Sequence, residues 1–156
     1  MAKYFFSGRF LHCFNLAEHW APEAVNSAIE GLSEKNNVTP TECISCASEV
    51  AKKMGASDEE MIMFVGFAGG LCLSGSACGA LAAAIWIKSL KWCREVAKKS
   101  SMSNPYSKDT LESFFHATDS KISCSQITGF QFEGVDDHTN FIKNNGCERL
   151  IELLAE

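Results

Sequence analysis

The sequence predicts an all-α protein, a single-domain bundle of about five to seven helices. Only 3 of its 156 residues are proline, which favours helices over a many-turned β sandwich. Apolar residues recur at helical spacing, and two capping boxes, in which Ser or Thr precedes Glu by three residues, mark helix starts. The hydrophobic fraction of 46% is enough for one core.

Residues 1–37 are expected to form a helical extension of the main domain, which covers residues 38–156. Within the extension, Pro22 suits the first turn of a helix. Val25, Ile29 and Leu32 then follow at helical spacing. The polar residues 34–37 are expected to be a linker.

The two capping boxes open the main domain. They are Thr39 with Glu42, and Ser57 with Glu60. The first predicts a helix that ends at Gly55, and the second predicts a helix through Ala68 that ends at a glycine pair. Further helices are expected from about Ala77 to Lys99 (the longest), through Leu111, Phe114 and Phe115, from Asp136 or Asp137 through Ile142, and from Cys147 through Leu154.

Charge and patterning exclude several classes of function. The net charge is −5, and no basic stripe runs along the chain, so nucleic-acid binding is not expected. Residues 61–87 carry no charge, but glycines interrupt them, which favours two buried helices over a membrane span. The N-terminus lacks a clean apolar signal segment, so a cytoplasmic location is predicted.

Cysteine is the most informative residue type in this sequence. There are eight: Cys13, Cys43, Cys46, Cys72, Cys78, Cys93, Cys124 and Cys147. In a protein that is not exported, cysteines are metal ligands, redox groups or core residues more often than structural disulfides. Cys93 follows Trp92 on an amphipathic helix and is assigned to the core, whereas Cys13 and Cys72 are core or bystander thiols.

Several cysteines are predicted at helix starts. Cys78 and Cys147 each follow a glycine-containing turn, and Cys43 lies in a capped first turn. A helix N-terminus stabilises a thiolate, so these thiols are expected to have a lowered pKa. Cys43 and Cys46 also have the CxxC spacing, which suits a redox pair or half of a four-thiolate metal site.

The four histidines show no ligand spacing. His12, His19, His116 and His138 are each interpreted as surface or core residues. No phosphate-binding loop, dinucleotide fingerprint or nucleophile elbow is present either.

The run GFAGGLCLSGSACGAL, residues 66–81, resembles the signature of the C_GCAxxG_C_C family of redox-active proteins. Members are small helical proteins with an early cysteine, a glycine-rich turn that leads into Cys-Gly-Ala, and two later cysteines. Here Cys78, Gly79 and Ala80 match that triplet, and Gly69, Gly70 and Gly75 precede it. The early cysteine is Cys43 by spacing or Cys46 by its following alanine, and the later cysteines are Cys124 and Cys147.

The resemblance covers residues 38–156 and implies thiol-based redox activity. It implies Cys43, Cys78, Cys124 and Cys147 as reactive residues, and Gly69, Gly70, Gly75 and Gly79 as the positions where a ligand or second thiol approaches the backbone. Cys43 with Cys78 and Cys124 with Cys147 are candidate pairs. The final glycine of the signature is Ala83 here, so helix packing at that point is expected to differ.

Two other functions fit the same residues. One is a zinc or iron–sulfur site whose ligands come from Cys43, Cys46, Cys78, Cys124 and Cys147. The other is a helical binding or oligomerisation module, a homo-oligomer included, with aromatic residues of the extension as its surface. The sequence identifies no redox partner, electron donor or substrate.

Overall fold

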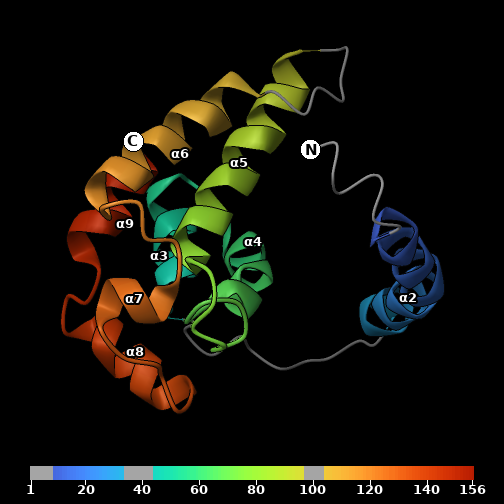
Figure 1. The fold of residues 1–156 in the computed structure, drawn as a ribbon, viewed down its shortest axis with the longest axis horizontal. Coiled ribbons are helices and arrows are strands. Elements are labelled where there is room, and N and C mark those ends of the chain that lie inside the picture. The colour runs from blue at the N-terminus through green and yellow to red at the C-terminus, as the bar shows by residue number, and fades with distance from the viewer. Residues whose placement is uncertain (1–8, 34–43, 97–103) are drawn as a thin grey trace. The chain divides into compact units, whose positions relative to one another are not determined.

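The structure, a computed structural model, describes residues 9–33, 44–96 and 104–156 (Figure 1). Within these ranges the chain forms α-helices and one 3₁₀ helix, and no strand, which confirms the all-α prediction. The elements are α2 (Arg9–Ser33), α3 (Cys46–Lys53), α4 (Asp58–Met63), η1 (Val65–Phe67), α5 (Gly79–Glu95), α6 (Pro105–Ala117), α7 (Cys124–Thr128), α8 (Val135–Lys143) and α9 (Glu148–Ala155).

The chain divides into two compact units, Met1–Pro40 and Thr41–Glu156. The first contains α2, a helix of 25 residues with Pro22 in its interior. The prediction that Pro22 begins a helix is therefore wrong. No glycine or proline interrupts residues 9–21, so nothing in the sequence ends the helix before Pro22. At 25 residues α2 also exceeds α5, at 17, which was expected to be the longest helix.

In the second unit, α3 begins later than predicted. Ser45 is its N-cap, and residues 44 and 45 are not helical, so the expected helix from Thr39 is wrong at its start. The Ser45 hydroxyl accepts a hydrogen bond from the Ser48 N–H at 3.0 Å, and the Ser48 hydroxyl accepts one from the Ser45 N–H at 2.8 Å. This reciprocal pair is a capping box built from two serines, and it fixes Cys46 as the first residue of α3.

The second capping box is confirmed. Ser57 is the N-cap of α4. Its hydroxyl accepts a hydrogen bond from the Glu60 N–H, and the Glu60 carboxylate accepts one from the Ser57 N–H. The helix is shorter than expected, because α4 ends at Met63 and a 3₁₀ turn replaces its continuation. Gly55, with φ +83°, follows the end of α3 as predicted.

Two later helix boundaries also differ from prediction. Gly134 is the N-cap of α8, and Asp136 and Asp137 lie in the first turn, where their charge favours the helix N-terminus. The helix α5 ends at Glu95 rather than near Lys99, and Cys93 near its end is exposed, not in the core. None of the described helices is long and apolar enough to cross a lipid bilayer.

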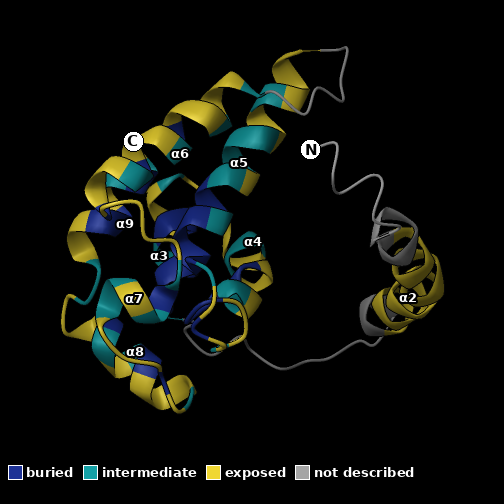
Figure 2. Ribbon diagram, viewed as in Figure 1, coloured by how far each residue is buried: buried dark blue, intermediate teal, exposed yellow. Residues whose placement is uncertain are grey.

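The core lies where α3 crosses the start of α5, with α9 and α6 packed beside them (Figures 1 and 2). Small residues line this crossing. Ala47, Val50, Ala51, Ala83 and Ala84 are all fully buried. Because alanine side chains are short, the two helices can pack closely, and Ala83 lies in this contact. Phe114 of α6 and Leu154 of α9 complete the core.

Candidate functional site

Four cysteines lie at the starts of four helices in the second unit. Cys46 and Cys124 are the first residues of α3 and α7. Cys78 and Cys147 are the N-cap residues of α5 and α9. The prediction that cysteines occupy helix starts is thus confirmed for Cys78 and Cys147.

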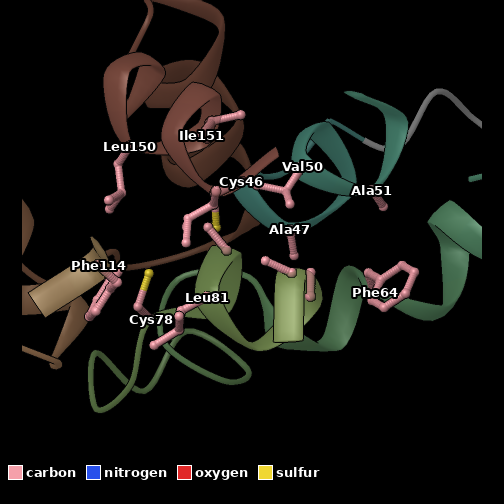
Figure 3. Close-up of a cluster of buried hydrophobic side chains, with 14 of the residues drawn as sticks. Cys46, Ala47, Val50, Ala51, Phe64, Cys78, Leu81, Phe114, Leu150 and Ile151 are labelled. Atoms are coloured by element: carbon pink, nitrogen blue, oxygen red, sulfur yellow. The ribbon is translucent and has the colours of Figure 1, made fainter. Parts of the chain in front are cut away.

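All four cysteines line one small cavity at the edge of the core. Its other walls are mostly apolar and come from the first turn of α5, from α7, α8 and α9, and from the segment before α8. The lining consists of Cys46, Cys78, Cys124, Cys147, Gly79, Ala80, Ile127, Thr128, Phe132, His138, Phe141, Ile142 and Leu150. Figure 3 shows the sulfur atoms of Cys46 and Cys78 among the buried side chains, on the side where Leu150 and Phe114 lie.

The cavity is nearly filled by its own walls. Its volume is about 10 Å³, which is close to the minimum for a single water molecule. Cys46, Cys78 and Cys124 are buried, and Cys147 is half-buried. The described cysteines are all free, so the four that line the cavity are thiols.

Burial raises the pKa of every thiol in this cavity. It raises the pKa of Cys78 and Cys147 to about 12 and that of Cys124 to about 11, and it raises the pKa of Cys46 as well. Negative charge on Cys46 also raises the pKa of the other three. The expected lowering of the thiol pKa is therefore wrong for Cys78 and Cys147, because loss of water outweighs the helix dipole.

Backbone groups oppose this effect most clearly at Cys46. Hydrogen bonds from the backbone of Gly69, Ala47 and Ala80 favour its thiolate and lower its pKa, although burial remains the larger effect. These groups belong to the loop of residues 69–75, to α3 and to α5. The Cys46 sulfur therefore lies where three parts of the chain meet.

The glycine-rich loop, residues 69–75, holds α7 against the cavity. The carbonyl oxygen of Gly75 accepts two hydrogen bonds from Ser125, one from the N–H and one from the hydroxyl, both at 3.1 Å. Gly70 has φ +85°, and a Cβ added there would lie 2.9 Å from the Cβ of Cys124 and 2.8 Å from the backbone of Gly75. Glycine at this position therefore allows Cys124 to approach the loop.

A second close approach occurs at Gly79. A Cβ on Gly79 would overlap the carbonyl oxygen of Phe67, so only glycine lets the first turn of α5 pack on η1. Four glycines were predicted to admit a ligand or second thiol: Gly69, Gly70, Gly75 and Gly79. For Gly70 and Gly79 the neighbouring groups are the chain's own backbone and the Cys124 side chain.

The match to a known family covers this whole unit. A family model described as "Putative redox-active protein (C_GCAxxG_C_C)" matches residues 41–156, well over half of the chain. The chain belongs to this family. No curated protein and no solved structure matches the chain.

In this member of the C_GCAxxG_C_C family, the structure describes only one of the two cysteines that have the CxxC spacing. Cys46 lines the cavity, whereas Cys43, predicted as a reactive residue, lies outside the described residues. The alternative sequence match, Cys46 followed by Ala47, is the signal that indicated the cavity cysteine. Cys72 is exposed and donates a hydrogen bond from its sulfur to the Gly66 carbonyl oxygen at 3.3 Å.

His138 is a cavity residue that the sequence analysis assigned to no function. Its side chain is buried, and its ring lies edge-on to Phe132 with centroids 4.8 Å apart. Burial lowers its pKa below 6.5, and the neighbouring Asp137 partly opposes this. The signal in the sequence is its position four residues before Ile142, which places both on one helix face.

A metal site was the alternative prediction for the same cysteines. Among residues 9–33, 44–96 and 104–156, the structure places no three histidine, cysteine or acidic side chains in an arrangement that would hold a metal ion.

Proposed function

We propose that this protein is a thiol–disulfide redox protein whose reactive groups are Cys46, Cys78, Cys124 and Cys147. The observation that carries the proposal is their convergence on a single small cavity from four separate helix starts. If these four cysteines only filled the core, they would not need to line the same cavity. Membership of a family described as redox-active supports the same class of chemistry.

The reaction is a two-electron exchange between thiols and a disulfide. Two cavity thiols lose two electrons and two protons and form one S–S bond, while a partner disulfide gains both and is released as two thiols. The reverse reaction regenerates the cavity thiols. Four thiols provide for one or two such bonds.

The size of the cavity favours sulfur–sulfur bonding within the protein. A space of about 10 Å³ has no room for an organic cofactor. A disulfide requires no added volume, because the two sulfur atoms move closer together when they bond.

His138 supplies the base that these thiols need. A thiol attacks a disulfide as the thiolate, and thiols with a pKa of about 11 or 12 carry very little thiolate near pH 7. Among the cavity residues, only His138 has a side chain that accepts a proton near neutral pH. Its lowered pKa keeps the imidazole neutral and able to accept that proton.

The test uses a variant that retains only the four cavity cysteines. Cys13, Cys43, Cys72 and Cys93 are each replaced by serine, and the protein is equilibrated in buffers with different ratios of reduced to oxidised dithiothreitol. Free thiols are then counted in denaturant. We expect the count to fall by two or four and to be restored by excess reductant.

A matched pair of single variants in the full chain gives the control. Cys78→Ser leaves three cavity thiols and should limit the cavity to one disulfide and two electrons, whereas Cys93→Ser removes an exposed thiol and should leave the cavity's exchange unchanged. A thiol count that stays constant across all buffers, with the fold intact by circular dichroism, contradicts the proposal.

A further inference from the structure

A wide groove lies outside the thiol cavity and shares one wall with it. The groove has a volume of about 1310 Å³ and is formed by α6, the turn after it, α7, α8 and α9. Ile127, Thr128, Phe141, Cys147 and Leu150 line both spaces. Of the four cavity cysteines, Cys147 alone lines the groove.

Exposure and backbone conformation also distinguish Cys147. Cys46, Cys78 and Cys124 are buried, but Cys147 is half-buried. Cys147 has φ +60° and ψ +13°, in the left-handed region, whereas an N-cap residue is normally extended. The residue lines both groove and cavity, and unfavourable conformations of this kind concentrate at functional sites.

We propose that Cys147 is the thiol at which exchange begins, and that the groove binds a basic polypeptide segment that carries the partner disulfide. This inference rests on the proposed redox function and assigns a substrate class and an order of reaction to it.

The exchange proceeds in two balanced steps. The Cys147 thiolate attacks one sulfur of the partner disulfide, a mixed disulfide forms, and the other partner sulfur leaves as a thiolate that takes up a proton. A buried cavity thiol then loses its proton and attacks the Cys147 sulfur. The second partner thiol is released, and a disulfide remains inside the protein.

The dimensions of the groove indicate a polypeptide rather than a small thiol compound. Pockets for small molecules are usually about 300–1,000 Å³, and this groove is larger. It also runs along elements from Glu112 on α6 to Glu156 at the end of α9. A disulfide in an extended segment would therefore reach Cys147 with neighbouring residues in contact with the walls.

The charge of the groove indicates a basic segment. Five acidic residues line it, against two permanent cations: Glu112, Asp119, Glu148, Glu152 and Glu156, with Lys121 and Arg149. Lys108 and Lys53, outside the groove, lie 3.5 and 4.0 Å from Glu112 and Glu152, but both pairs are exposed and screened by solvent. The lining remains acidic, in keeping with the net charge of −5 for the chain.

The experiment compares two peptide disulfides on the variant that retains only the four cavity cysteines. Each probe is a symmetrical disulfide of a short peptide with one cysteine, which is flanked by lysines in one probe and by glutamates in the other. The rate of peptide-thiol release is measured at low and high salt. Mass spectrometry after an early acid quench locates the first mixed disulfide.

We expect the first adduct on Cys147, and release from the lysine probe about tenfold faster at low salt, with the difference lost at high salt. Cys147→Ser should slow release at least about tenfold, and Cys78→Ser much less, because Cys78 does not face the groove. The adduct position is measured without any cavity substitution, so it stands even if Cys147→Ser folds poorly.

Each component of the inference has its own contrary result. A first adduct on a buried cysteine overturns the role of Cys147, and equal rates for the two probes overturn the basic partner. In both cases the cavity disulfide would still form, so the proposed function would stand. Absence of any cavity disulfide with either probe refutes the proposed function itself.

Discussion

Two effects compete at each cavity thiol, and their magnitudes decide the result. A helix N-terminus favours an anion by about 0.3–1 kcal/mol, which corresponds to less than one pKa unit. Burial raises the pKa of Cys78 from 9.0 to about 12. The thiols are thus protonated near neutral pH. Their reactivity therefore depends on a base that removes the proton, or on access of the partner disulfide, and not on a thiolate that is already present.

His138 tests this dependence at the level of one residue. His138→Gln should slow oxidation of the cavity thiols by a partner disulfide by about 100-fold near pH 7, which is within the range for loss of a general base. His19→Gln is the control, because His19 lies on α2 in the first unit. Stopped-flow or quenched measurement of thiol loss gives the rates.

The pH profile separates a base from a structural residue. The pKa of His138 is lowered below 6.5 by burial, so the imidazole is neutral above that value. The rate should be nearly constant from pH 6.5 to about 8 and fall as the pH drops through the lowered pKa. In the variant, solvent hydroxide must remove the proton, and the rate should rise about tenfold per pH unit. Parallel profiles for the two proteins would show that His138 only fills space.

At the scale of elements, the position of Cys46 depends on the capping box at Ser45 and Ser48. Ser45→Ala should lower the free energy of unfolding by about 1 kcal/mol and change the exchange rate of the cavity thiols, because the first turn of α3 carries Cys46. Ser57→Ala removes the equivalent cap of α4, which contributes no residue to the cavity. It should cost similar stability and leave the exchange rate unchanged. An equal change in exchange rate for Ser45→Ala and Ser57→Ala would contradict a specific role of the α3 cap.

Helix starts can be predicted from local sequence patterns, and at helix starts some of these predictions are right and others are wrong. Ser57 with Glu60 obeys a local rule and was found. Thr39 with Glu42 obeys the same rule, yet α3 starts at Cys46, because Ser45 and Ser48 form a cap that the Ser/Thr-x-x-Glu pattern does not describe. Local patterns identify candidate caps, and packing selects among them.

At the scale of the molecule, the cavity is assembled by contacts between distant segments. Ser125 on α7 bonds to Gly75, 50 residues earlier. The hydroxyl of Thr139 on α8 donates to the Ile44 carbonyl oxygen, 95 residues earlier, at 3.2 Å. The sequence could name cysteines near helix starts, but not these long-range contacts. It therefore left Cys43 and Cys46 as alternatives for the early cysteine, and it could not predict that burial raises each pKa or that His138 shares the cavity.

The central claim is that four distant thiols share one cavity and bond there to one another. Disulfide mapping tests it most directly: the intact chain is oxidised mildly, alkylated, digested without reduction and analysed by mass spectrometry. We predict that the first disulfides each join two of Cys46, Cys78, Cys124 and Cys147, while Cys72 and Cys93 are recovered alkylated. Recovery of those four as alkylated thiols, with disulfides confined to the other cysteines, would contradict the account.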